Sequence, residues 1–480
     1  MTNNIKKNIG YQTVYNILIT ILPLITAPYL ARHLGVTSQG IYSYTNSIVN
    51  YFVLFAMLGI SSHGTKCIAK SKENKELLSE KFFSIYFIQL FSSITLLLLY
   101  MLYLIFIVKD NVYISIIQTI AIISCIFDIN WLFLGCEDFK FVIIRNIIFR
   151  LSSVVLILLF VKTSNDLWIY TLIMTMSTLL SNITLWLKFK TLIKFKRPSK
   201  DKIISEIKPI IVLFIPLLAL SVYHIMDKTM LGLLSDYKNV GFYYNADKVI
   251  NIPIGIISGI STVLFPRSII ALNDSKIEFQ KLLIKGLDGT MMVATALSFG
   301  IAAIANEFTP IFFGNGFEPC IYLIIVLSPV MIIKSISTII RYQYLIPLNK
   351  ENVFIYSVIG GALSNLLLNL LLIPKIGALG AAIGTLLAEL IACVIQFILI
   401  KNEAKYLIKN LKSIGIYLLF GVLMYTIVRV FASSININIM IKLILEILIG
   451  STMYILLLYL YMKKSNKLSL YFNNEFKNRR

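Results

Sequence analysis

The stretch that decides the fold, Leu30–Asn50, reads LARHLGVTSQGIYSYTNSIVN. A second copy, Leu231–Asn251, reads LGLLSDYKNVGFYYNADKVIN and lies 201 positions further along the chain. Both copies contain a Gly-x-Tyr step, and both end on two aliphatic residues and an asparagine. Each copy joins the end of one long apolar segment to the start of the next. If six membrane spans separate the copies, both face the same way, which predicts parallel structural repeats.

Composition indicates a membrane protein. Of the 480 residues, 58% are hydrophobic and 14% are charged, and the mean hydropathy is +0.83. Apolar runs of about 20 residues, the length that an α-helix needs to cross a bilayer, follow one another almost without pause. Backbone groups in lipid must pair within their own segment, so we expect helices rather than the alternating strands of a barrel. The first run, near Tyr11–His33, is too long for a signal peptide and is interpreted as a retained span.

The apolar runs predict an all-α polytopic protein with fourteen spans. They begin near Tyr11, Gly40, Phe82, Val112, Phe141, Leu167, Pro209, Val249, Gly286, Cys320, Asn352, Ala378, Leu411 and Ile437. Lys and Arg collect on the cytoplasmic side of membrane proteins. With the N-terminus inside, that side carries 33 of the 44 basic residues and the outer side carries 6, so we expect both termini to be cytoplasmic.

The longest polar interruption follows the sixth span and divides the chain. We expect an N-terminal six-helix lobe (residues 1–190), a basic cytoplasmic linker (191–208) and a C-terminal six-helix lobe (209–400). Two additional transmembrane helices and a basic C-terminal tail follow (401–480). The linker lysines could hold anionic lipid headgroups, or they could act only as a topology signal and a solvated connector.

Motifs for catalysis, metal binding or a cofactor are missing from the sequence. The three histidines are scattered, the five cysteines lack ligand spacing and are interpreted as free thiols, and there is no phosphate loop or nucleophile elbow. We therefore expect no metal and no cofactor. The net charge of +21 comes from basic residues that punctuate the spans, so we expect no nucleic-acid partner.

Charges inside the spans are the strongest functional signal. A charge at the centre of a membrane helix costs about 2.5–3.5 kcal/mol, so such a residue normally faces a cavity or a partner. The residues predicted to line a cationic cavity are Arg32, Arg145, Arg150, Lys228, Lys248, Lys334 and Arg341. A phosphate-bearing ligand would find donors along such a cavity. The alternative is that some of these charges pair internally.

Acidic residues inside the spans suggest ion coupling. Asp227 and Glu389 lie deep enough in their predicted helices to bind H⁺ or Na⁺. Lys442 and Glu446 are four residues apart on one helix, so we expect them to form a local pair.

Several short motifs occur in the order found in a known family. They are Thr26–Gly35, Gly40–Ser43, Asp227–Gly232, Phe265–Arg267, Phe313–Phe317 and Ile373–Lys375. Together they resemble polysaccharide exporters of the Wzx type, which belong to the multidrug/oligosaccharidyl-lipid/polysaccharide flippase superfamily. The resemblance implies two six-helix lobes around a central cationic cavity, with the last two helices peripheral. The arginine series that lipid II flippases carry in their first span is reduced here to Arg32.

The resemblance also implies a function. The expected substrate is an undecaprenyl-pyrophosphate-linked oligosaccharide, a repeat unit of capsule, O-antigen or a related polymer, turned to the outer leaflet of the bacterial cytoplasmic membrane. Expected partners are membrane lipids, a polysaccharide polymerase and other assembly proteins. A multidrug exporter of the same superfamily is an alternative, although a cationic cavity repels cationic drugs. A polymerase or transferase is the alternative from another class, and the absence of a long outer loop counts against it.

Overall fold

The computed structural model describes residues 2–409 and 411–465, and the basic tail after Ser465 lies outside the described residues. In the described part of the chain every regular element is helical, which confirms the all-α fold. The first elements are α1 (Thr2–Met57), α2 (Ile60–Ser71), α3 (Lys75–Phe106), α4 (Val112–Phe127), α5 (Asn130–Gly135), α6 (Phe139–Phe160), η1 (Ser164–Asp166), α7 (Leu167–Leu192) and α8 (Lys200–Leu234). They are followed by α9 (Tyr237–Asp274), α10 (Lys276–Phe313), α11 (Pro319–Ile340), η2 (Arg341–Leu345), α12 (Glu351–Ile400), α13 (Lys405–Lys409), α14 (Leu411–Ser434) and α15 (Ile439–Lys464).

Eleven helical segments of the described chain are long and apolar enough to cross a membrane. Two of them contain a break that separates two predicted spans. The break in α1 lies at Gly35, with φ +72°, and the break in α12 lies at Ile376 and Gly377. Helix α8, which contains the seventh predicted span, is not among the eleven. The number of fourteen spans therefore stays a prediction.

The chain forms two compact units. Unit 1 comprises Met1–Tyr244 and Leu366–Ala381, and unit 2 comprises Asn245–Asn365 and Ala382–Arg480. This division does not follow the predicted lobes, because α8 and part of α12 belong to unit 1. The arrangement of six-helix lobes around a central cavity stays a prediction.

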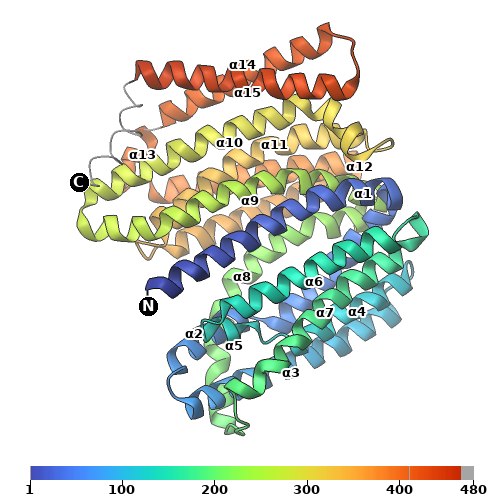
Figure 1. Cartoon of the computed structure of the whole chain (residues 1–480), viewed down its shortest axis with the longest axis vertical. Coiled ribbons are helices and arrows are strands. Elements are labelled where there is room, and N and C mark those ends of the chain that lie inside the picture. Colours follow the sequence, from blue (N-terminus) through green and yellow to red (C-terminus); the bar gives the residue numbers. More distant parts are fainter. Residues whose placement is uncertain (1, 410, 466–480) are drawn as a thin grey trace. The chain divides into compact units, whose positions relative to one another are not determined.

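Unit 1 is a bundle in which α4 packs against α1, α3 and α7, and α6 packs against α1 and α7 (Figure 1). One core cluster fills the end where α2, α3, α5 and α8 meet, and its largest buried side chains are Trp131, Phe82 and Phe133. A second cluster lies among α1, α4, α6 and α7 and includes Leu34, Tyr42 and Tyr170. Asn74 begins α3 by accepting hydrogen bonds from the backbone N–H groups of the first turn.

The two copies of the repeated stretch touch within unit 1. A Cβ atom added to Gly40 would lie 1.7 Å from the carbonyl oxygen of Tyr237, and one added to Gly241 would lie 2.1 Å from that of Val36. Only a residue without a side chain allows two backbones to approach so closely. The repeated glycines therefore mark a close crossing between α1 and α9.

Unit 2 is organised around α10, which packs against α11, α14 and α15. Its main core cluster contains the buried residues Phe279, Leu287, Met291 and Tyr417. Ser275 caps the start of α10, and Asn438 caps the start of α15. The two C-terminal helices are therefore integral to the packing of this unit.

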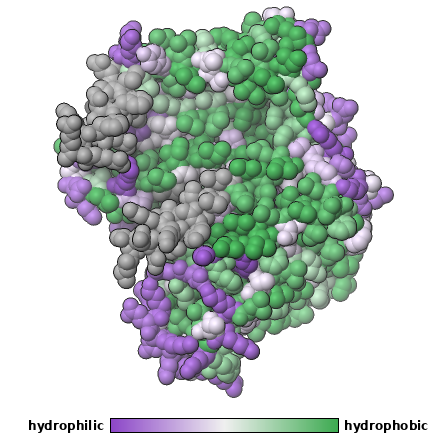
Figure 2. All heavy atoms as spheres, in the orientation of Figure 1, coloured by the Kyte–Doolittle hydropathy of each residue, from purple (hydrophilic) through white to green (hydrophobic). Residues whose placement is uncertain are grey.

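The helices expose large apolar side chains over most of their length. Phe91, Ile105, Phe106 and Leu187 are each more than 70% exposed. Figure 2 shows hydrophobic residues over much of the visible face, and hydrophilic residues gathered where α2 leads into α3. Such exposed apolar surface suits contact with lipid, because lipid chains cover it without the cost that water would impose.

Candidate functional site

Arg150 on α6 lies within electrostatic range of two tyrosines of unit 1. Tyr42 on α1 and Tyr170 on α7 are buried, and their rings meet edge to face with centroids 4.7 Å apart. The positive charge of Arg150 acts on both hydroxyl groups. The arginine is half-buried, and no hydrogen bond or ion pair of its guanidinium is found among residues 2–409 and 411–465. Its donors are therefore available to an anionic ligand.

Lys228 on α8 extends this group. Its ammonium lies 5.7 Å from the ring centroid of Tyr244, and the hydroxyl group of Tyr244 shares a hydrogen bond with that of Tyr170. We call Arg150, Lys228, Tyr42, Tyr170 and Tyr244 the cation–tyrosine cluster. Its members come from five different helices, α1, α6, α7, α8 and α9. The cluster brings together two of the seven cations predicted from the sequence.

Asp227 lies next to Lys228 in the chain and is buried. Tyr243 donates a hydrogen bond of 2.6 Å to Oδ2 of Asp227, and the side-chain amide of Asn369 donates one of 2.6 Å to Oδ1. Both oxygens are therefore held by neutral donors from other helices. A carboxylate held in this way can accept a proton or contribute to the binding of a cation.

Two other predicted cations of unit 1 lie in different surroundings. Arg145 on α6 is 5% exposed, and its guanidinium donates to the backbone oxygen of Ser181 and to the side-chain oxygens of Asn130 and Asn146. Three of its hydrogen-bonding positions are therefore already used within the unit. Arg32 on α1 is exposed, just before the break at Gly35.

In unit 2 two predicted site residues pair with each other. Nζ of Lys334 on α11 lies 3.2 Å from Oε1 of Glu389 on α12, although the two atoms are not aligned as a hydrogen bond. Arg341 places its guanidinium 4.0 Å from the ring centroid of Phe354, a stacked cation–π contact. Lys248 on α9 is half-buried.

A charge cluster around the buried Glu307 in unit 2 was not predicted. Arg429 on α14 lies 2.9 Å and Lys442 on α15 lies 3.2 Å from the carboxylate of Glu307 on α10. The predicted local pair between Lys442 and Glu446 is wrong, because Glu307 takes the lysine. Both oxygens of Glu446 are buried without a hydrogen-bond partner in the described part of the chain.

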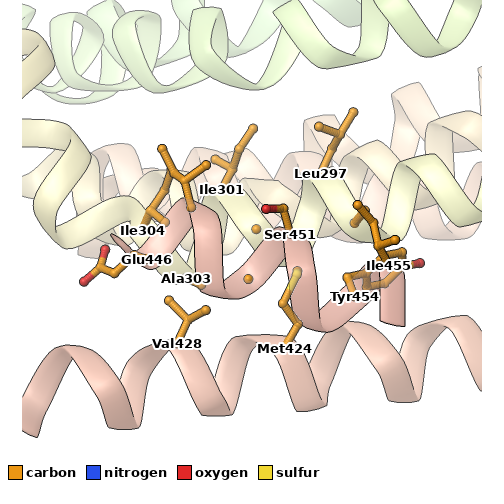
Figure 3. Close-up of a pocket in the computed structure, with 14 residues that line it drawn as sticks. Leu297, Ile301, Ala303, Ile304, Met424, Val428, Glu446, Ser451, Tyr454 and Ile455 are labelled. Carbon is orange, nitrogen blue, oxygen red and sulfur yellow. The ribbon is translucent and has the colours of Figure 1, made fainter. Parts of the chain in front are cut away.

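Glu446 lies at one end of an apolar pocket among α10, α14 and α15 (Figure 3). The pocket has a volume of about 390 Å³, and its lining includes Leu297, Ile301, Met424 and Val428. Tyr454 lies at the other end and donates a hydrogen bond of 2.9 Å to the backbone oxygen of Met292. The apolar lining of this pocket suits a hydrocarbon chain.

A second lysine–tyrosine contact lies at the end of α6 and resembles that of Lys228. The ammonium of Lys162 is 5.7 Å from the ring centroid of Tyr29 and is exposed. The backbone N–H groups of Lys162 and Thr163 donate to the carboxylate of Asp166. Lys162 belongs to the loop after α6, and neither Lys162 nor Tyr29 is a member of the cation–tyrosine cluster.

The helical arrangement is that of known membrane transport proteins. The solved structure "Lipid II flippase MurJ, inward closed conformation" aligns with a TM-score of 0.77 over 95% of this chain and 99% of that chain, at 16% identity. An inward-facing multidrug resistance MATE family transporter of the MOP superfamily aligns with a TM-score of 0.61 over 82% of this chain and 99% of that chain, at 13% identity. The chain is thus a multi-pass membrane protein with this fold.

The chain belongs to the family described as "Polysaccharide biosynthesis protein", which matches residues 5–271, more than half of its length. This match confirms the resemblance noted in the sequence. A "Putative O-antigen transporter" of Escherichia coli (strain K12) is 25% identical over 83% of this chain and 97% of its own length. The "Probable low-salt glycan biosynthesis flippase Agl15" of Haloferax volcanii is 24% identical over 50% of each chain.

Proposed function

We propose that this protein moves undecaprenyl-pyrophosphate-linked oligosaccharide repeat units of a surface polysaccharide from the inner to the outer leaflet of the cytoplasmic membrane. It acts as a transporter that alternates access to its binding site and makes or breaks no covalent bond in its substrate. The family, the relatives and the fold support this proposal. We place both termini in the cytoplasm, which the distribution of basic residues supports.

The observation that carries the proposal is the cation–tyrosine cluster. A pyrophosphate is an anion that arginine binds through paired hydrogen bonds and lysine binds as a point charge. Tyr42 and Tyr170 are buried, so the half-buried ring of Tyr244 is the one in this cluster that offers an apolar face to a sugar ring. The guanidinium of Arg150, half-buried within electrostatic range of Tyr42 and Tyr170, therefore suits the headgroup of a lipid-linked oligosaccharide.

Movement between leaflets tests this function. Purified protein is reconstituted into liposomes with a labelled undecaprenyl-pyrophosphate oligosaccharide, and the appearance of the label in the opposite leaflet is followed. We expect Arg150→Ala and Lys228→Ala to slow this movement by at least about tenfold, a barrier increase of about 1.4 kcal/mol. Lys162→Ala is the matched control, because it removes a lysine at the same 5.7 Å from a tyrosine ring outside the cluster, and it should retain the wild-type rate.

Three other outcomes of these experiments would contradict the proposal. Wild-type rates in both cluster variants would remove the cluster from the substrate path. A lipid that is shortened or extended instead of moved would identify a transferase or polymerase. Resistance to cationic drugs without lipid movement would identify a multidrug exporter.

Asp227 and Glu389 are our candidates for coupling to H⁺ or Na⁺. A proton on Glu389 would weaken its attraction for Lys334 and leave that cation available to the substrate. Asp227 is held only 2.6 Å from each of two neutral donors, Tyr243 and Asn369, and could gain a cation without losing its place. Transport that responds equally to pH and Na⁺ gradients in the wild type, Asp227→Asn and Glu389→Gln would exclude this coupling.

The tail of the substrate has its own requirement. A polyprenyl chain is apolar and suits either the bilayer or the pocket lined by α10, α14 and α15. We expect a polysaccharide polymerase and other assembly proteins to receive the repeat unit after it has crossed.

A further inference from the structure

Three potential metal ligands meet at the end of unit 1 where α2 packs against α8. Nε2 of His63 lies 2.5 Å from Oε2 of Glu206, and Sγ of Cys67 lies 3.4 Å from the same nitrogen. The sulfur is 3.9 Å from Oε2 of Glu206. All three ligand atoms thus lie within 4.8 Å of one another, and no other such group is found in the described part of the chain.

Local structure fixes these side chains. His63 and Cys67 are four residues apart on α2, so both point from one face of the helix toward the first turns of α8. Gly64, between them, lies against the ring of Trp131, where a Cβ atom would come within 2.6 Å of the indole. His63 is 7% exposed and Glu206 is 4% exposed. The ligands are therefore held in place before any ion arrives.

Lys81 on α3 orients the carboxylate. Its ammonium lies 2.5 Å from Oε1 of Glu206, so the other oxygen, Oε2, is directed at His63 and Cys67. Hydrogen bonds to the second atom of a ligand commonly fix its orientation in metal sites. The carboxylate can thus bind through one oxygen while Lys81 balances part of the negative charge.

The separations are close to those of a zinc site. Zinc bonds of about 2.3 Å to sulfur, about 2.0 Å to nitrogen and about 2.1 Å to oxygen, arranged as a tetrahedron, separate the ligand atoms by roughly 3.3–3.6 Å. Of the two distances from the sulfur, 3.4 Å lies within this range and 3.9 Å is slightly longer. Only the distance of 2.5 Å between His63 and Glu206 is too short, and a shift of about 1 Å would open it.

We propose that His63, Cys67 and Glu206 bind one divalent transition-metal ion of the zinc type. Imidazole, thiolate and carboxylate together suit a metal of intermediate softness, and Mg²⁺ or Ca²⁺ would prefer oxygen ligands alone. The fourth position of the tetrahedron is left for water. The ion joins α2 to the start of α8, which lies within the predicted basic linker (191–208), and so fastens that helix within unit 1. This site is separate from the cation–tyrosine cluster and from the coupling ion proposed above.

Cobalt binding tests the site without any transport assay. Full-length protein in detergent is titrated with Co²⁺, which gives an intense thiolate-to-cobalt absorption band when a cysteine is a ligand. We expect one Co²⁺ per chain, displaced by Zn²⁺. Cys67→Ser should abolish the band, and His63→Gln should weaken binding by at least about tenfold. Cys136→Ser is the matched control, because Cys136 is the other half-buried thiol of unit 1 and belongs to no ligand group, so its band should persist.

Thermal unfolding gives a second measurement of metal binding, in which each variant is compared with itself in the presence and absence of Zn²⁺. Zn²⁺ should raise the unfolding temperature of the wild type and of Cys136→Ser, and the same Zn²⁺ concentration should raise that of His63→Gln by less. No cobalt band in the wild type, or a band that survives Cys67→Ser, would overturn the proposal. The three residues and Lys81 would then act only as a hydrogen-bonded clamp between α2, α3 and α8.

Discussion

The second copy of the repeated stretch, together with the residues just before it, carries charged side chains whose counterparts in the first copy are uncharged. The offset of 201 residues pairs Asp227 and Lys228 with Thr26 and Ala27, and it pairs Asp247 and Lys248 with Asn46 and Ser47. The glycines at the crossing are kept in both copies, and so is the tyrosine two positions later. The tyrosines nevertheless have different partners: Tyr42 contacts Tyr170, whereas Tyr243 donates to Asp227.

This difference distinguishes the residues that pack the two copies together from the residues that carry ionisable groups. The crossing between α1 and α9 requires a glycine from each copy, because each glycine faces the backbone of the other copy. The first copy contains Arg32 and Tyr42, whereas the adjacent pair Asp227 and Lys228 occurs only beside the second copy. Thr26 instead donates to the backbone oxygen of Leu22 within its own helix. A repeat can thus keep its packing residues while a buried carboxylate, Asp227, occurs beside one copy alone.

The largest effect is expected from Gly40→Ala. Its Cβ would lie 1.7 Å from the carbonyl oxygen of Tyr237, an atom of the backbone that cannot rotate away. Overpacking of this kind typically costs about 1–3 kcal/mol and sometimes more, so we expect a large fall in unfolding temperature and in the yield of folded protein. Gly241→Ala should behave in the same way, because its Cβ would meet the carbonyl oxygen of Val36 at 2.1 Å.

Gly289→Ala is the control for this comparison. Gly289 lies within α10, and a Cβ there would meet nothing within 4 Å. Alanine favours a helix by about 1 kcal/mol over glycine, so this variant should be at least as stable as the wild type. Equal stability of Gly40→Ala and Gly289→Ala would show that the two copies do not cross as described.

The next effect concerns transport rather than stability. Asp227→Asn keeps the shape of the side chain and removes its charge, so we expect the rate of substrate movement to fall by about tenfold or more. Thr26→Val alters the matching position of the first copy and should leave the rate unchanged. The measurement is the leaflet assay in liposomes, normalised to the amount of folded protein. A similar loss in both variants would mean that the two positions act through packing and not through charge.

A smaller effect is expected from removing the two tyrosine hydroxyls. Tyr243→Phe leaves the buried carboxylate of Asp227 without one of its donors, which should cost about 1–3 kcal/mol. Tyr42→Phe removes a hydrogen bond between neutral groups and should cost about 0.5–1.5 kcal/mol. Thermal unfolding of both variants measures the difference. A larger loss of stability in Tyr42→Phe than in Tyr243→Phe would indicate that the carboxyl of Asp227 is neutral.

Much of the fold could be predicted because its signals are local. Long apolar runs predict the helices, and Gly35 and Gly377 lie where predicted spans meet. The repeat predicted equivalent positions, but it could not predict that Gly40 and Gly241 touch, because that contact depends on how distant helices pack. The boundary between the compact units could not be predicted from the sequence either. Helix α8 packs against α1 and α3 rather than only against its neighbours in sequence.

The site was only partly predictable, because sequence indicates how deep a charge lies but not which way it points. The depths of Lys334 and Glu389 were inferred separately, and their pairing across two helices was not. The prediction for Lys442 and Glu446 was wrong because Glu307, from a third helix, competes for the lysine. The four-residue spacing of His63 and Cys67 was a usable signal for a shared helix face, but its third ligand follows 139 residues later.

The smallest effect in the comparison of the two copies is expected at Gly35. Here the first copy breaks α1 with φ +72°, a conformation that residues with a side chain rarely adopt, whereas a Cβ would meet nothing within 4 Å. Gly35→Ala should therefore cost only about 1 kcal/mol, through backbone strain alone. Gly35→Asn should recover none of that loss, because ψ of +175° places Gly35 outside the left-handed helical region that asparagine tolerates. If both variants unfold at the same temperature as Gly40→Ala, the space around Gly35 is filled, and the break in the first copy depends on packing as the crossing does.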